Sequence, residues 1–140
     1  MKVLKVKHDG PFDFSVCGLG FESRAITAYL QSQSLIDRLY VLGYDENTDK
    51  FSYASNKKTF AATAKAIFEV GDNKIQETIR EIADLEGFTS PVNALIDITV
   101  MSRHRLATLI SFFIDVLPQG STLTVVYSLS EFVPPPDDTT

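Results

Sequence analysis

The sequence has few residues that form disulfides or metal sites, and it has no long hydrophobic run. Because Cys17 is its single cysteine, an internal disulfide is excluded and a cytoplasmic location is expected. The two histidines, His8 and His104, have no metal-ligand spacing with that cysteine, so no metal site is predicted and no cofactor is expected. No apolar run approaches about 18 residues, and the N-terminus lacks a signal-peptide layout, so no membrane partner is predicted.

Positive charge is also scarce. The chain has 13 Lys and Arg residues against 18 Asp and Glu, a net charge of −5. No predicted face carries a basic stripe, so duplex nucleic acid is not expected as a partner. A local anion site stays open, because net charge does not determine the potential inside one pocket. The sequence contains neither a Walker loop nor a G-x-S-x-G elbow.

Short apolar segments alternate with amphipathic segments along the chain. Strands are predicted over residues 1–8 (an edge strand), 12–17, 36–42, 67–70, 92–98 and 123–127, and helices over 23–34, 52–66, 73–86 and 102–117. This alternation predicts a Rossmann-like α/β fold: a mainly parallel sheet of five or six strands in the order 3-2-1-4-5, counted from Phe12, with helices on both faces. One domain should span residues 1–133. The Pro- and Asp-rich residues 134–140 are typical of a linker, so we expect a fragment of a larger protein.

Local signals predict where the helices begin and end. Asn73 and Gln76 have the spacing of a capping box, and Gly87 is expected to end that helix. Ser102 should cap the last helix, and His104 and Arg105 are expected on the solvated side of its start. The predicted core consists of apolar strand residues, namely Val16, Val41, Leu42, Leu95, Ile96 and Val125.

In the predicted strand order the first and fourth strands are neighbours, and the chain reverses its winding direction between them. Ligands bind in the crevice outside the carboxyl ends of the strands at such a switch point. The two loops that meet there, residues 18–24 and 97–103, are also the ones in which glycine and polar residues follow apolar strands. We therefore predict a ligand site between them.

The first of these loops contains Gly18 and Gly20, which resemble half of a dinucleotide fingerprint. The two glycines would let backbone amides approach a ligand phosphate at a helix N-terminus, and Asp45 lies where an acid could bind a ribose hydroxyl. The third glycine of the fingerprint is replaced by Ser23. The plainer alternative is a tight turn that needs glycine backbone angles.

Glu22 and Arg24 follow in the same loop. Glu22 is a candidate general base or ribose ligand, although a carboxylate is also favourable in a first helical turn without any function. Arg24 is less favourable there, which suggests that it faces an anion or pairs with Glu22.

The second loop carries Asp97, Thr99, Ser102 and Arg103. Asp97 can accept hydrogen bonds from an adenine amine or a ribose hydroxyl, Thr99 and Ser102 offer hydroxyls, and the planar fork of Arg103 suits a phosphate. The alternative is structural: Asp97 ties down its own loop, Ser102 only caps a helix and Arg103 is solvated.

The segment from Asp97 to Arg103 resembles the strand-four signature of the CRISPR-associated Rossmann-fold (CARF) ligand-sensing domains. That signature has an acid, an apolar residue, a threonine or serine, two small residues, another threonine or serine, and a base. The chain differs at Val100 and Met101, where the family usually has glycines. The resemblance implies sensing of a cyclic oligoadenylate by a homodimer, coupled to a covalently linked or separate effector domain.

Three functions therefore remain open. The favoured one is a regulatory domain that senses a nucleotide-type anion or cyclic oligonucleotide, as in a prokaryotic defence or signalling protein. Its ligand-binding residues would be Gly18, Gly20, Glu22, Arg24, Asp97, Thr99, Ser102 and Arg103. The second is a nucleotide-processing enzyme with Glu22 as the catalytic residue. The third is a scaffold domain without a ligand.

Overall fold

The computed structural model describes residues 10–128. They form a five-stranded parallel sheet in the order β3-β2-β1-β4-β5. The strands are β1 (Phe12–Gly18), β2 (Ile36–Gly43), β3 (Ala66–Glu69), β4 (Asn93–Asp97) and β5 (Thr122–Val126). The predicted α/β class and the predicted strand order are confirmed. The expected edge strand, residues 1–8, and the expected linker, residues 134–140, lie outside the described residues.

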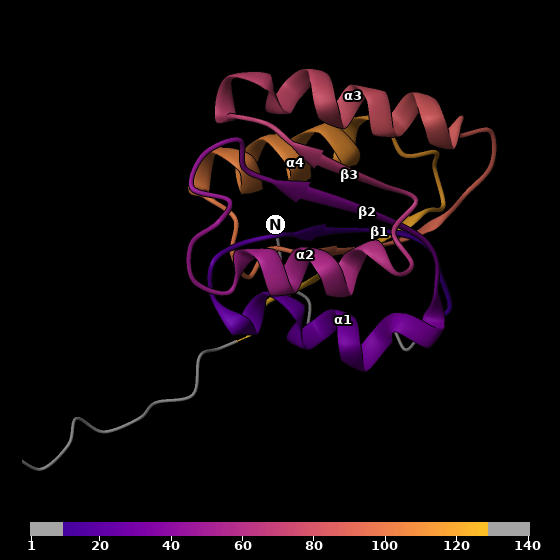
Figure 1. Ribbon diagram of the computed structural model, residues 1–140. Helices are drawn as coiled ribbons and strands as arrows, with labels where there is room; N and C mark the ends of the chain where they lie inside the picture. Colours follow the sequence, from indigo (N-terminus) through magenta and orange to yellow (C-terminus); the bar gives the residue numbers. More distant parts are fainter. Residues whose placement is uncertain (1–9, 129–140) are drawn as a thin grey trace, which may run out of the picture.

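Helices cover both faces of the sheet (Figure 1). Helices α1 (Thr27–Ser32) and α2 (Tyr53–Ala61) connect β1, β2 and β3 on one face, and α3 (Ile75–Glu86) and α4 (Arg103–Val116) connect β3, β4 and β5 on the other. Right-handed crossovers require this division, because the chain moves outward from β1 to β3 and then returns to β4. β1 and β4 are hydrogen-bonded neighbours, so the predicted switch point is present.

The core lies on both sides of the sheet. One cluster joins apolar residues of β1, β2 and β4 to α3 and α4, and the second joins the other face of β1 and β2 to α1 and α2. As predicted, the buried strand residues include Val16, Val41, Leu42, Leu95 and Ile96. The prediction for Val125 is wrong: it is half-buried, because β5 lies at the edge of the sheet that residues 10–128 form and pairs there with β4 alone.

Two predicted helices differ in extent. The first is divided into a 3-10 turn (Ser23–Ile26), α1 and a second 3-10 turn (Gln33–Leu35), none of which has a side-chain N-cap. The second ends at Ala61, several residues early, because the chain joins the sheet instead: Lys65 N donates to Leu39 O at 2.8 Å. Strand pairing here outweighs the helix propensity of the alanine-rich segment.

The predicted capping box in the third helix is wrong. The chain enters α3 through a 3-10 turn (Asp72–Lys74), so Lys74 is the N-cap residue and no side chain caps the helix. Its other end is as predicted: Gly87 adopts a left-handed conformation with φ of 57°, and its N–H donates to Ala83 O at 2.9 Å.

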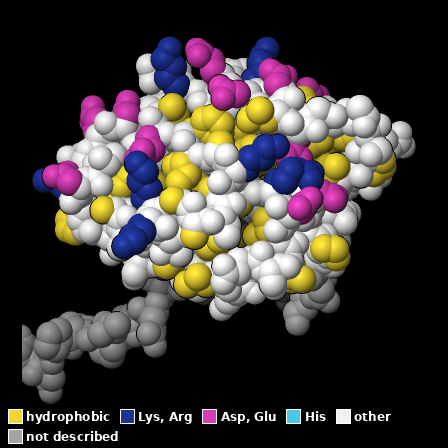
Figure 2. All heavy atoms as spheres, turned by 45° about the vertical axis from the view of Figure 1, so that its right-hand side comes forward, with side chains coloured by type: hydrophobic (Ala, Val, Ile, Leu, Met, Phe, Trp, Pro, Cys, Tyr) yellow, Lys and Arg dark blue, Asp and Glu magenta, His cyan; other side chains and the backbone are white. Residues whose placement is uncertain are grey.

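The face in Figure 2 carries Lys and Arg side chains interspersed with Asp and Glu, with hydrophobic side chains between them. An ion pair between Arg38 of β2 and Glu86 of α3 joins the sheet to a helix, with Arg38 Nη2 at 2.8 Å from Glu86 Oε1.

None of the helices within residues 10–128 has both the length and the apolar character that crossing a membrane requires.

Candidate functional site

The carboxyl ends of the strands lie on the left of Figure 1, where the loops that follow β1 to β4 gather. Two pockets open there. The first, here called the switch-point pocket, has a volume of about 270 Å³ and is lined by Gly20, Phe21, Glu22, Arg24, Tyr44, Thr99, Val100 and Met101. The second, the side pocket, has a volume of about 440 Å³ and is lined by Phe21, Tyr44, Asp45, Glu46, Asn47, Gly71, Asp72 and Asn73.

An aromatic pair separates the two pockets and lines both of them. The rings of Phe21 and Tyr44 are stacked, with centroids 5.8 Å apart and an interplanar angle of 25°. The Tyr44 hydroxyl donates to Val100 O at 3.2 Å, and the buried Tyr53 hydroxyl accepts from Tyr44 N at 2.9 Å. Hydrogen bonds to the loop after β4 and to α2 therefore hold this partition in place.

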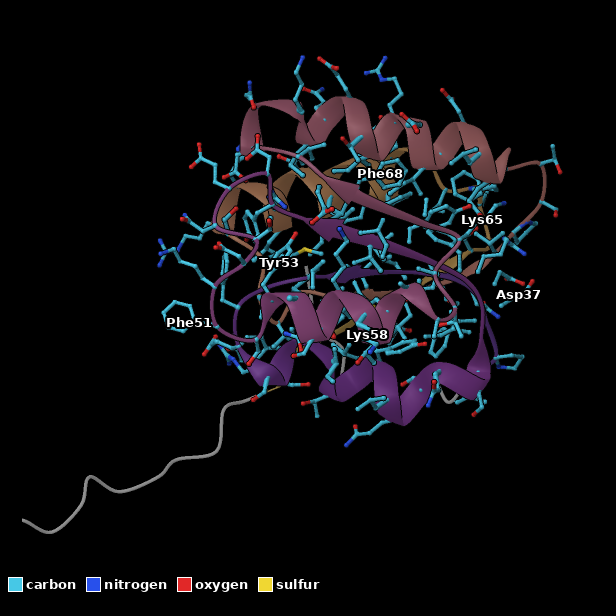
Figure 3. All side chains as sticks on the ribbon, in the orientation of Figure 1. Asp37, Phe51, Tyr53, Lys58, Lys65 and Phe68 are labelled. Carbon is cyan, nitrogen blue, oxygen red and sulfur yellow. The ribbon has the colours of Figure 1, made fainter. Side chains whose placement is uncertain are left out.

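Figure 3 shows Tyr53 between α2 and the sheet, whereas Phe51, two residues earlier, points away from the body of the protein. Phe51 is 87% exposed, has a φ of 53° and lines neither pocket.

The structure brings together four of the eight predicted site residues. Gly20, Glu22, Arg24 and Thr99 line the switch-point pocket. Gly18, Asp97, Ser102 and Arg103 line neither pocket.

Gly18 and Gly20 pack tightly against Val100. A Cβ atom on Gly18 would lie 2.9 Å from Val100 Cγ2, and one on Gly20 would lie 2.8 Å from Val100 Cβ. Neither glycine has a left-handed backbone, so the need for glycine comes from this close approach and not from backbone angles. Val100, which stands where the CARF signature usually has glycine, thus occupies space that the two glycines leave open.

Arg24 is the cation of the switch-point pocket. Its guanidinium pairs with Glu22, with Nη2 at 3.0 Å from Oε2, and Nη1 donates to Tyr127 Oη and Ser128 O, both at 3.2 Å. The bond to Tyr127, followed by that to Glu22, raises the pKa of Arg24, so the group stays positively charged. The Glu22 side chain is 57% exposed and that of Arg24 is 22% exposed.

Asp97 is buried at the end of β4 and binds its own loop. Its Oδ1 accepts from Thr99 N at 3.0 Å and from the Thr99 hydroxyl, while Oδ2 has no hydrogen-bond partner among the described residues. Burial raises the pKa of Asp97, and the hydrogen bonds from Thr99 oppose that rise. Cys17, its register partner on β1, has a pKa raised to about 12, first by burial and then by Asp97, so its thiol stays protonated and unreactive.

A scan against protein-family models gave no match, and a search of curated proteins gave none either.

Ser102 and Arg103, the two remaining predicted site residues, lie at the start of α4 and have different environments. Ser102 is the predicted N-cap: its Oγ accepts from Arg105 N at 3.1 Å. Arg103 is exposed, and its side chain makes no hydrogen bond or ion pair with the part of the chain that the structure describes. Its predicted role in anion binding stays a prediction.

Sequence reasoning missed Arg105. The prediction that it is solvated is wrong, because its side chain is 1% exposed and contacts Tyr44 and Asp72, two residues that line the side pocket. Its Nε donates to Asp72 Oδ1 at 2.6 Å, its Nη1 and Nη2 donate to Gly43 O and Val70 O, and its guanidinium lies 4.0 Å from the centre of the Tyr44 ring. Helical spacing could have revealed this, because Arg105 precedes the buried Leu109 and Phe113 at intervals of one turn.

The side pocket contains three carboxylates, those of Asp45, Glu46 and Asp72. Asp45 is the acid that the sequence placed near a ribose. Within residues 10–128 no group of three or more His, Cys, Asp and Glu side chains is arranged to hold a metal ion. The two pockets thus offer different chemistry: one cation and hydroxyls on one side of the aromatic partition, and several hydrogen-bond acceptors on the other.

Proposed function

We propose that this domain binds a nucleotide-type anion across the switch point and serves as the ligand-sensing part of a larger protein. The observation that supports this proposal is the pairing of two pockets at the carboxyl ends of the strands, one with the Arg24 guanidinium and one with carboxylates, on either side of the Phe21–Tyr44 pair. Ligands of this fold class bind in the same position.

Each part of a nucleotide has matching groups. A phosphate would bind at Arg24, because charge-assisted hydrogen bonds to a guanidinium are strong. Thr99 lines the same pocket as Arg24. The donor-bearing ribose and base would lie in the side pocket, where Asp45 and Asp72 can accept hydrogen bonds. A pocket of about 440 Å³ is within the usual range for small-molecule sites.

The environment of Glu22 favours binding over catalysis. A catalytic carboxylate needs a closed pocket that perturbs it, whereas the Glu22 side chain is 57% exposed and ion-paired with Arg24. Sensing requires only convergent donors and acceptors. The resemblance to CARF domains adds a cyclic oligoadenylate, bound by a homodimer, to the ligands that should be tested.

Thermal-shift titrations with ADP, cyclic triadenylate and inorganic phosphate test the proposal. A ligand present at about a hundred times its dissociation constant should stabilise the folded protein by roughly 2.7 kcal/mol. Arg24→Gln should weaken all three ligands, whereas Asp45→Asn should weaken the two nucleotides and leave phosphate unchanged. Arg103→Gln serves as the comparison, since Arg103 lines neither pocket.

Two results would contradict the proposal. If no nucleotide stabilises the wild-type protein, the scaffold function is favoured. If Arg103→Gln abolishes binding while Arg24→Gln does not, the anion binds at the start of α4 and the proposed pockets are wrong.

A further inference from the structure

The segment that follows β5 contacts the cation of the switch-point pocket. Arg24 Nη1 donates to the Tyr127 hydroxyl and to Ser128 O, both at 3.2 Å, and the Arg24 guanidinium carbon lies 5.6 Å from the centre of the Tyr127 ring. The other side of the same segment is also bound, because Ser128 N donates to Thr99 Oγ1 at 2.9 Å. Tyr127 and Ser128 therefore bridge two residues that line the pocket, Arg24 and Thr99.

These contacts occupy the donors that an anion would need. Arg24 directs Nε and Nη2 toward Glu22 and Nη1 toward Tyr127 and Ser128, so each of its three nitrogens already has an acceptor. The acceptors on Nη1, a hydroxyl and a peptide carbonyl, are both neutral. A phosphate oxygen accepts a stronger, charge-assisted hydrogen bond from the same nitrogen and would displace them.

We propose that Tyr127 and Ser128 form an intrachain latch that competes with the anionic ligand for Arg24, so that ligand binding releases these two residues. This inference rests on the proposed function and adds its regulation. Because coupling between two binding events is reciprocal, a weaker latch must give tighter ligand binding, and bound ligand must loosen the latch to the same extent.

The latch also extends to the end of β4. Ser128 N donates to the Thr99 hydroxyl, and that hydroxyl donates to Asp97 Oδ1. Release of Ser128 would therefore leave Thr99 bound only within its own loop. A ligand at Arg24 thus changes the contacts of two segments that are far apart in sequence.

The test measures ADP affinity by calorimetry and the exchange rate of the Ser128 amide by NMR, both on the full chain. Tyr127→Ala removes the ring and the hydroxyl, and we expect ADP to bind roughly three- to tenfold tighter. Tyr127→Phe removes only the hydroxyl and should give a smaller gain. Tyr127 is 52% exposed, so both variants should fold. Leu85→Ala, an exposed apolar residue of α3, is the matched control and should leave ADP affinity unchanged.

Amide exchange gives a second readout. Saturating ADP should accelerate exchange at Ser128, because the hydrogen bond to Thr99 is lost as the latch opens. Arg24→Gln should accelerate the exchange at Ser128 without any ligand, and should also weaken ADP binding.

The outcomes separate the latch from the proposed function. If ADP binds in an Arg24-dependent manner but Tyr127→Ala has wild-type affinity and Ser128 exchange does not respond to ADP, the latch is wrong and the proposed function stands. If ADP and cyclic triadenylate bind neither the wild type nor Tyr127→Ala, both proposals are wrong.

Discussion

Asp97 is a buried carboxylate, and within residues 10–128 one of its oxygens has hydrogen-bond partners and the other has none. Its side chain is held by Thr99, and burial raises its pKa. A group with a raised carboxyl pKa in the folded state holds its proton at a pH at which the unfolded chain has lost it. The folded protein therefore loses stability as pH rises from about 4, the ordinary pKa of aspartate, through the raised value.

This predicts a pH-dependent effect of Asp97→Asn. The amide keeps the acceptor for Thr99 but cannot ionise, so the free energy of unfolding of the variant, relative to wild type, should increase between about pH 4 and pH 7. Urea denaturation of both proteins across this range measures the difference. A difference that does not change with pH would show that Asp97 is not titrating in a buried site.

The position of Asp97 was predictable from sequence, but its partners were not. An acid directly after an apolar strand lies at the carboxyl edge of a parallel sheet, and the structure has it there. The side chain binds Thr99 and lines neither pocket, which is the structural alternative that the sequence left open. The choice depends on the loop that folds over it, and a linear pattern does not specify that loop.

At the scale of elements, the two predicted helix N-caps had different outcomes. Ser102 has an extended backbone and accepts from Arg105 N, whereas Asn73 lies inside the 3-10 turn that precedes α3 and caps nothing. Both residue types are good caps, so the difference comes from where the preceding loop enters the helix.

We predict that Ser102→Ala lowers the free energy of unfolding by about 1 kcal/mol, because an N–H at the start of α4 loses its acceptor. Asn73→Ala is the matched control and should change it by less than about 0.5 kcal/mol. Chemical denaturation of both variants gives the comparison. Equal losses would mean that the hydroxyl of Ser102 contributes no specific cap.

Helix limits were the least predictable feature of the elements. The alanine-rich segment after Tyr53 favours a longer helix than α2, but Lys65 bonds to Leu39 and the chain enters β3. A backbone group that joins a sheet gains a partner from a distant segment, and local propensity cannot anticipate that gain.

At the scale of the whole molecule, Arg105 joins three parts of the fold. It lies in the first turn of α4 and donates to the end of β2 at Gly43, to the segment after β3 at Val70 and to Asp72. The ion-pair partner of Arg105 is Asp72, whose side chain is 47% exposed. Because water still solvates Asp72, the desolvation cost of the Arg105–Asp72 pair is limited. Arg105 therefore connects the start of α4 to the end of β2, to the segment after β3 and to Asp72, which lines the side pocket.

We predict that Arg105→Met costs about 2–4 kcal/mol of unfolding free energy, because methionine fills part of the space but leaves the carbonyls of Gly43 and Val70 without a donor. Arg103→Met, two residues earlier and exposed, should stay within about 0.5 kcal/mol of wild type. Urea denaturation measures both. A loss of less than 1 kcal/mol for Arg105→Met would show that water replaces the arginine at these carbonyls.

The sequence by itself determined the class of fold, the order of its strands and the edge of the sheet where polar loops meet. These follow from the alternation of apolar segments, from the handedness of crossovers and from the chemistry of residues after strands. Only the tertiary structure decided which arginine is buried, how Val100 fills the space above Gly18 and Gly20, and that Tyr127 reaches Arg24. Those contacts join residues that are distant in sequence, and the packing of whole layers decides which of them meet.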